Sequence, residues 1–207
     1  MKLKKGPKIV LICIIVLITL AACVALYIKL KPKKVEVQEV KILNTIEKYN
    51  YNLKDNKPKR YETLFRELEK ILTAKEVDIE EYANKISEMF IYDFYSLEDK
   101  STKTDVGGLE FVHPDAIPNF LVNAEDTYYK YVESNIYGDR TQKLPVVDEM
   151  IINATEKTSY IYQNNEYEAY KVNIAWTYTM DTFASYQNDA VLYFVKVDHK
   201  LYLVELK

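Results

Sequence analysis

Residues 9–28 form a run of twenty residues without a charged side chain, IVLICIIVLITLAACVALYI, with lysines on both sides. A helix of this length spans about 30 Å, the thickness of the hydrocarbon core of a membrane. Tyr27 near the end of the run is typical of a membrane interface, and so are the lysines that follow it. The run therefore predicts a single transmembrane helix and leaves residues 35–207 to form a folded domain.

A bacterial lipoprotein signal is a second interpretation of the same stretch. The segment before the run, MKLKKGPK, is basic, and Leu-Ala-Ala-Cys at 20–23 resembles a lipobox. In this alternative Cys23 is lipidated and becomes the mature N-terminus. The apolar run continues for five residues beyond Cys23, which favours the uncleaved helix. Both interpretations attach the domain to the same membrane.

The direction of insertion is not decided by the lysines, because four lie before the run and four lie after it. Residues 35–207 contain no cysteine, which suits a compartment outside the cytoplasm. We therefore expect a basic cytoplasmic tail at 1–8, the anchor at 9–28, a basic juxtamembrane linker at 29–34 and one extracytoplasmic domain at 35–207. The expected location is a bacterial cell membrane, since the abundance of Lys, Ile, Asn and Tyr indicates an AT-rich genome.

The composition of residues 35–207 excludes several classes of function. This part of the chain holds 20 of the 28 basic residues and all 31 acidic ones, a formal net charge of −11. Such a surface repels phosphate polymers, so we expect no nucleic acid partner. The whole chain has only four glycines, far below the usual share of about 7%. Glycine-rich loops that cradle phosphates are therefore not expected.

Helical patterns dominate the first half of the domain. Apolar residues recur at helical spacing over 35–53, 59–73 and 78–95, and again from Pro118 to Val132. Asp78 with Glu81 three residues later predicts a capping box at the third helix. The polar segment 97–108 is expected to be an exposed loop.

Strand patterns dominate the second half. Alternation is clearest over 170–180, where the face that includes Tyr170 and Trp176 is predicted to be buried. Less regular strands are expected over 149–162, 190–197 and 201–206. The predicted fold class is α+β, with N-terminal helices packed on one face of a curved four-stranded antiparallel meander, behind one transmembrane helix.

No catalytic, cofactor-binding or metal site is predicted. His113 and His199 are the only histidines, and neither has metal-ligand spacing to a partner. The carboxylate pairs at 125–126 and 148–149 are adjacent residues, which do not face each other on a helix or a strand. We therefore expect no cofactor and no enzymatic activity.

Tyrosine is the one residue type that indicates a binding surface. Eighteen tyrosines lie beyond the anchor. Three of them, Tyr128, Tyr129 and Tyr131, lie on one predicted helix and cannot all face inward. Tyrosine is enriched at protein interfaces. The alternative is that AT-rich codon usage has placed tyrosines at core and half-exposed positions.

The order of elements, helices followed by a meander of long strands behind one membrane helix, resembles the nuclear transport factor two-like superfamily, a cystatin-like cone. It is most similar to membrane-anchored extracytoplasmic scaffold subunits of type IV secretion and conjugation machines. The resemblance covers residues 35–207 by element order alone and carries over no functional residue. It implies assembly with envelope proteins or self-association. The leading hypothesis is accordingly a non-enzymatic assembly domain, and the alternative is a surface lipoprotein or tethered receptor that binds a small molecule or glycan in a cone-shaped cavity.

Overall fold

The computed structural model describes residues 5–30 and 40–207 of the chain, which comprises two units, residues 1–37 and 38–207. In the first unit, α1 (Lys5–Leu30) is a continuous helix of 26 residues. Thr19 Oγ1 donates a hydrogen bond to the Val16 carbonyl oxygen (2.9 Å), a bond that a helical threonine makes without breaking the helix. The prediction of a helix over 9–28 is confirmed.

The prediction that this helix crosses a membrane is not confirmed. In the described ranges, none of the helices was found to be both long enough and apolar enough for a membrane span. Residues 1–4 of the expected tail, 31–34 of the expected linker and 35–39 of the expected domain lie outside the described residues.

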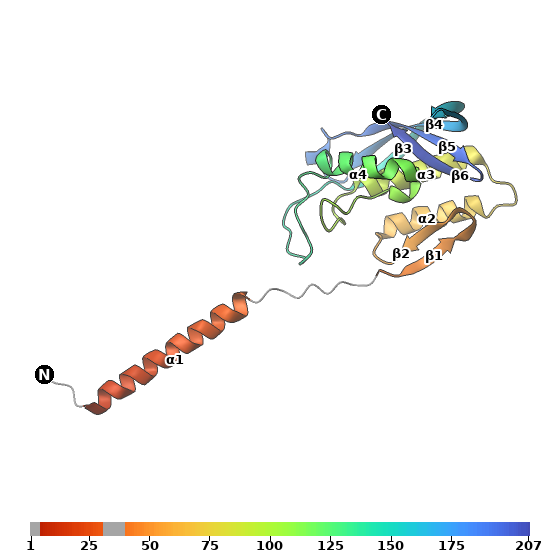
Figure 1. The fold of residues 1–207 in the computed structure, drawn as a ribbon. Helices are drawn as coiled ribbons and strands as arrows, with labels where there is room; N and C mark the ends of the chain where they lie inside the picture. The colour runs from red at the N-terminus through yellow and green to blue at the C-terminus, as the bar shows by residue number, and fades with distance from the viewer. Residues whose placement is uncertain (1–4, 31–39) are drawn as a thin grey trace. The chain divides into compact units, whose positions relative to one another are not determined.

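The second unit is an α+β fold with helices on one face of a curved antiparallel sheet (Figure 1). Its strands are hydrogen-bonded in chain order, as the predicted meander requires: β3 (Val147–Tyr162), β4 (Asn165–Tyr178), β5 (Asp189–Val197) and β6 (Lys200–Leu206). The pairing of β3 with β4 shifts register twice, after Val147 and after Ile152. Such irregularities bend a strand and increase its twist.

Alternation along β4 creates the core face of the sheet. Four alternate residues of β4 are each at most 4% exposed: Tyr170, Val172, Ile174 and Trp176. The three residues between them are less buried. Ala169, which comes just before them, is also buried. Because successive side chains point to opposite faces of a strand, the aromatic and β-branched positions share the side that faces the helices. The predicted buried face is confirmed.

The helices form two layers beneath the sheet (Figure 1). They are α2 (Lys59–Leu72), α3 (Ile79–Tyr95) and α4 (Ile117–Asp126). Helix α3 contacts β3 and β4 on one side and α2 on the other, which explains why most of its residues are buried. The Asp78 carboxylate accepts hydrogen bonds from the backbone N–H groups of Glu80 and Glu81 (2.9 and 3.1 Å) and caps its start, as the sequence predicts.

The helix predicted over 35–53 is wrong in its described part. The chain forms an antiparallel hairpin there, β1 (Ile42–Ile46) and β2 (Tyr51–Lys54). Asn50 turns the chain in a left-handed conformation (φ 52°), which asparagine tolerates better than most residues. Alternate residues beyond it, Tyr51 and Leu53, are buried while Leu43 is 58% exposed. The three-residue spacing that indicated a helix was therefore coincidental.

Short 3-10 turns connect these elements in the described chain: η1 (Glu47–Tyr49), η2 (Leu109–Phe111), η3 (Pro114–Ala116) and η4 (Asp181–Phe183). The expected exposed loop at 97–108 is only partly exposed, since Leu97, Lys100 and Val106 are at most 7% exposed. Helix α4 also ends earlier than the pattern through Val132 predicts, because the chain leaves helical geometry at Thr127 (φ −118°, ψ −94°).

Candidate functional site: a polar cavity above a buried ion cluster

A cavity of about 450 Å³ lies between β2, the segment from 105 to 117 and the start of β6. This volume lies in the range of small-molecule sites. Amide, ammonium and carboxylate groups from segments far apart in the sequence converge on it. The polar residues that line it are Asn50, Asn52, Lys54, Asn56, Lys57, Asp93, Asp105, Glu110, Lys200 and Tyr202.

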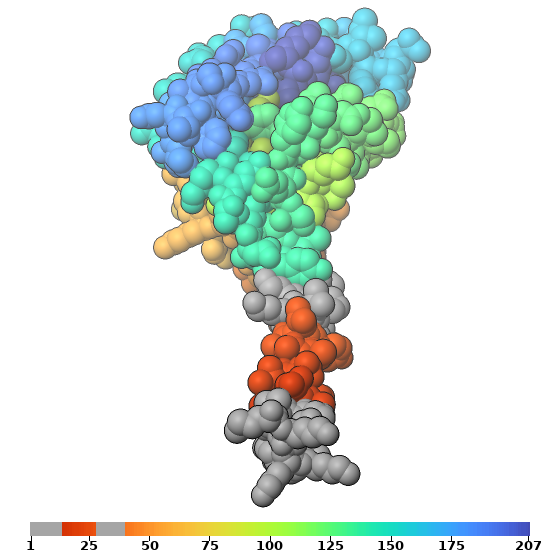
Figure 2. Space-filling view, turned by 90° about the vertical axis from the view of Figure 1, so that its left-hand side faces the viewer, coloured from red at the N-terminus to blue at the C-terminus, as the bar shows by residue number. Residues whose placement is uncertain are grey.

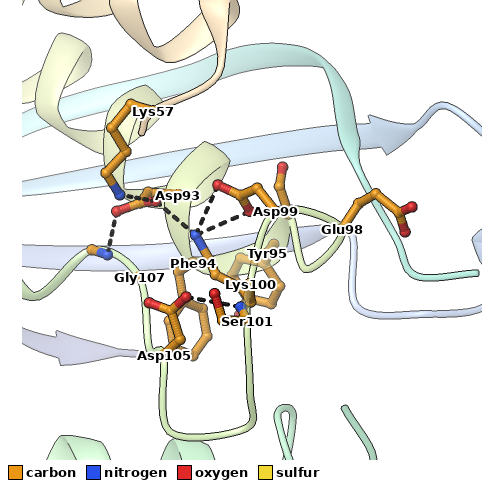
Figure 3. A network of polar contacts seen from close by, with 12 residues as sticks. Lys57, Asp93, Phe94, Tyr95, Glu98, Asp99, Lys100, Ser101, Asp105 and Gly107 are labelled. Carbon is orange, nitrogen blue, oxygen red and sulfur yellow. Dashed lines mark hydrogen bonds and ion pairs between the residues drawn. The ribbon is translucent and has the colours of Figure 1, made fainter. Parts of the chain in front are cut away.

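A buried ion cluster centred on Asp93 of α3 forms the floor of this cavity (Figure 3). Asp93 Oδ1 lies 2.6 Å from Lys57 Nζ and 2.9 Å from Lys100 Nζ. The second carboxylate oxygen accepts a hydrogen bond from the Gly108 N–H (2.8 Å). Lys100 also contacts Asp99 (3.2 Å). One carboxylate thus joins α3 to the chain before α2 and to the segment after α3.

The electrostatics of this cluster favour the charged carboxylate. Burial alone would raise the pKa of Asp93, but the ammonium groups of Lys100 and Lys57 outweigh it and hold that pKa well below its usual range. Burial also opposes the charge on Lys100, and the carboxylates of Asp93 and Asp99 overcome it, so the Lys100 pKa is raised. Both partners therefore remain ionised at neutral pH.

The Gly107–Gly108 pair lets the chain approach α3 closely enough to reach this carboxylate. A Cβ atom on Gly107 would lie 2.0 Å from the Asp93 backbone oxygen, and one on Gly108 would lie 2.7 Å from the Phe90 ring. Gly108 also has a positive φ of 75°, which glycine adopts at little cost. Glycine at both positions is therefore required by the contact with α3.

Glu110 forms a second buried carboxylate in the cavity wall. It accepts a hydrogen bond from the Tyr61 hydroxyl, a very short contact, and a longer one from the Asn52 N–H (3.4 Å). Burial raises the pKa of Glu110, and these two donors only partly offset the effect. The side chain is thus held between α2 and β2.

Strand β6 contributes a further part of the wall, where Lys200 and Tyr202 line the cavity. The His113 N–H donates to the Leu203 carbonyl oxygen (2.8 Å), and Val112 forms an isolated parallel bridge with the same residue. These contacts fix the segment that carries Glu110 beside β6. The cavity is therefore enclosed by elements that hydrogen bonds hold together.

A second hollow of about 400 Å³ lies between α4 and β6, elements that are neighbours on the face shown in Figure 2. Aromatic side chains dominate its wall, among them Phe94, Phe120 and Tyr128. Fewer polar groups converge here than on the first cavity. We therefore regard the polar cavity as the stronger candidate site.

The three tyrosines that indicated a binding surface all lie after α4 and not on it. The rings of Tyr128 and Tyr129 contact each other (6.1 Å between ring centres). Tyr128 lines the second hollow, and its hydroxyl donates to the Tyr95 carbonyl oxygen (3.2 Å). Tyr129 is fully buried; its hydroxyl donates to the Phe94 carbonyl oxygen (2.7 Å) and accepts from the Gly107 N–H (3.0 Å). Tyr131 is 76% exposed. The three residues do not form one surface.

Of the remaining candidates from the sequence, neither His113 nor His199 is among the residues that line the cavity. Cys23 is an exposed free cysteine on α1. His199 lies exposed in the turn before β6, where its Nε2 is within hydrogen-bonding distance of the Lys48 carbonyl oxygen and its ring contacts that of Tyr49 (5.1 Å between ring centres). His113 Nδ1 accepts from the Asp115 N–H (3.3 Å). Across the described ranges, no group of three or more acidic, histidine or cysteine side chains is placed to hold a metal ion.

Little in the sequence pointed to the residues that line the polar cavity or to the ion cluster beside it. Lys57, Lys100 and Lys200 occur among many lysines, and nothing in the local pattern distinguishes them. The one usable signal was the Gly107–Gly108 pair in a chain with four glycines, since glycine often marks a close backbone approach.

Comparisons with known proteins assign no family to this arrangement: neither a protein-family model, nor a curated protein, nor a solved structure matches the chain.

Proposed function

We propose that this chain is a membrane-anchored, extracytoplasmic and non-enzymatic domain of a bacterial cell envelope that binds a small polar molecule in the polar cavity. The observation that carries the proposal is the convergence of amide, ammonium and carboxylate groups on a cavity of about 450 Å³. A cavity with a few converging polar groups is the usual form of a small-molecule site. It favours the receptor hypothesis over the assembly hypothesis.

Binding is preferred to catalysis because the two buried carboxylates of the cavity are already engaged. Asp93 is held by two ammonium groups, and Glu110 accepts hydrogen bonds from Tyr61 and Asn52. A general acid or base needs to reach a proton on the substrate. Groups with these internal partners serve better to shape and orient a site.

The anchoring part of the proposal rests on the sequence of residues 9–28, with its twenty uncharged residues and flanking lysines. We expect the chain to fractionate with membranes, and external protease to digest the domain in intact cells. Mass spectrometry of the mature N-terminus separates the two forms of anchor: a retained Met1 supports the helix, and a lipid-modified Cys23 supports the lipoprotein. A domain protected from external protease contradicts the orientation.

Protein assembly is the second candidate, and the exposed edge of the sheet favours it. Strand β3 has 16 residues and lies at the end of the strand order, so one of its edges is free of strand partners among the described residues. Ile151 and Ile161 on this strand are 60% and 73% exposed. Edge strands of this kind can pair with another chain. Crosslinking in the native membrane through cysteines introduced along β3 tests this candidate.

The cavity is tested by screening small polar compounds against the full-length chain in a non-ionic detergent, with saturation-transfer NMR as the readout. Asn56 lines the cavity and is exposed, so Asn56→Trp places a large ring at its rim without disturbing the core. Lys75→Trp is the matched control, because Lys75 is exposed in the connection between α2 and α3. We expect compounds that bind the wild type and Lys75→Trp but lose binding to Asn56→Trp. Equal binding to all three chains contradicts the proposal.

A further inference from the structure

Lys200 is a buried cation in the wall of the polar cavity. It is only 9% exposed and begins β6, directly after a turn in which Asp198 adopts a left-handed conformation (φ 55°). Its position opposite Val197 in the β5–β6 pairing fixes its backbone. Lysine is almost never buried to this extent unless it is paired, so its environment requires an explanation.

Aromatic rings surround the Lys200 ammonium group. Its Nζ atom lies 4.2 Å from the centre of the Tyr51 ring and 5.1 Å from that of Tyr202. In the described part of the chain, the Lys200 ammonium group has these two ring contacts but forms no hydrogen bond or ion pair with a side chain or carbonyl group. Ring faces attract a cation, but they do not replace acceptors for three N–H donors. Burial lowers the pKa of Lys200, and the negative charge of Glu110 offsets only part of that decrease.

The two lysines at the floor of the cavity have a carboxylate partner, unlike Lys200. Lys57 and Lys100 both contact Asp93 within 3 Å. The carboxylate of Glu110 accepts hydrogen bonds from Tyr61 and Asn52, and its charge reaches Lys200 without an ion-pair contact between the two. Lys200 therefore presents to the cavity a positive charge that the surrounding protein leaves without a counterion.

We infer that the polar cavity binds a small monocarboxylate, whose carboxylate group pairs with Lys200 and whose remaining polar groups bind the amides of Asn50, Asn52 and Asn56. This inference rests on the proposed function of the same cavity. Lys54 also lines the cavity, but it is exposed. The single buried ammonium group of Lys200 matches the single charge of a carboxylate, whereas a phosphate monoester carries about −1.5 to −2 charges at neutral pH. The net charge of −11 on residues 35–207 also disfavours a more highly charged ligand.

The test compares matched compounds that differ in charge. The probes are D-glucuronate with its neutral amide D-glucuronamide, N-acetylglycine with N-acetylglycinamide, and inorganic phosphate. The four organic compounds are titrated into the full-length chain in a non-ionic detergent and followed by saturation-transfer NMR, and phosphate binding is measured by its competition with the carboxylates. The variants are Lys200→Gln, which removes the charge, Lys200→Arg, which keeps it, and Lys75→Gln, which removes an exposed charge elsewhere. Amide spectra of each variant establish that it is folded.

We expect a carboxylate to bind the wild type more tightly than its amide. Lys200→Gln should weaken that binding about tenfold or more, as loss of a hydrogen bond to a charged group does, while Lys200→Arg and Lys75→Gln retain it. Equal binding of the carboxylate and its amide, or a preference for phosphate, overturns this inference but leaves a ligand cavity in place. Two results overturn the proposed function as well. One is binding that is weakened by neither Lys200→Gln nor Asn56→Trp, and the other is no binding by any probe or screened compound.

Discussion

The ammonium group of Lys100 lies 2.9 Å from the carboxylate of Asp93, and these side chains are only 3% and 6% exposed. A buried ion pair contributes little net stability compared with apolar residues of the same shape, but removal of one partner leaves an uncompensated charge. Here the same carboxylate also holds Lys57 and the Gly108 N–H. Asp93 therefore joins the elements that form the floor of the polar cavity.

Asp93→Asn should lower the free energy of unfolding by about 3–5 kcal/mol, because it leaves two ammonium groups without their shared counterion. Urea denaturation measures the loss. Glu67→Gln is the control, since Lys85 keeps its contact with Glu88 (2.5 Å) when the half-exposed Glu67 is changed, and such pairs contribute about 0–1 kcal/mol. A loss for Asp93→Asn no larger than that for Glu67→Gln would contradict the account of the cluster.

The same pair predicts how stability depends on pH. Because the folded protein holds the pKa of Asp93 well below its usual range, the stabilisation is complete above the unfolded pKa of about 3.9 and is lost as the pH falls toward the lower folded value. We expect the difference in unfolding free energy between the wild type and Asp93→Asn to stay constant from about pH 7 to pH 5 and to shrink below about pH 4. An equal difference in unfolding free energy at pH 6 and pH 2.5 would contradict this prediction.

Gly108 and Gly138 have similar φ angles but different surroundings, so alanine at each position distinguishes the cost of backbone strain from the cost of a steric contact. Gly108 and Gly138 have φ values of 75° and 68°, but a Cβ would meet the Phe90 ring only at Gly108 and nothing within 4 Å at Gly138. Gly138→Ala should cost about 1–2 kcal/mol from the left-handed conformation alone. Gly108→Ala should cost about 1–3 kcal/mol more, because the added methyl group overpacks the contact with α3. Equal losses in thermal or urea unfolding would show that this contact is not tight.

The neighbouring tyrosines should respond differently to loss of their hydroxyl groups. Tyr129→Phe leaves the buried Phe94 carbonyl and Gly107 N–H without a hydrogen-bond partner, which costs about 1–3 kcal/mol. Tyr131→Phe changes an exposed side chain and should lie within about 0.5 kcal/mol of the wild type. Chemical denaturation of both variants measures the difference. A large loss for Tyr131→Phe would instead indicate that its hydroxyl has a structural role.

Hydrophobic periodicity predicted most of the fold because burial on one face leaves a clear mark. The strand through Tyr170 and Trp176 and the cap at Asp78 are both where the pattern predicts them. The β1–β2 hairpin was missed because its strands are joined by the 3-10 turn η1 and Asn50, without a glycine or proline, and its apolar residues also fit a helical spacing. Short segments with few apolar residues fit either period.

The polar cavity could not be predicted because its charges come from separate elements. Lys57, Asp93 and Lys200 lie before α2, on α3 and on β6, and only the packed fold brings them to one cavity. Charged residues in a sequence are expected to be solvated, so no local pattern marks Lys100 or Lys200 as buried. A candidate surface was predicted at Tyr128, Tyr129 and Tyr131 instead, but α4 ends before these residues, and Tyr129 is buried while Tyr131 is exposed.

Amide chemical-shift mapping of the full-length chain tests the central claim, that the polar cavity is the ligand site, most directly. D-glucuronate, or the best compound of the screen, is titrated into the labelled protein, and shifts are compared at the two hollows. We predict that the amides of Asn52 and Gly108 beside the polar cavity move with one saturable dependence, while those of Ala124 and Thr127 at the second hollow stay in place. Shifts confined to the second hollow, or no saturable shift at either, would contradict the claim.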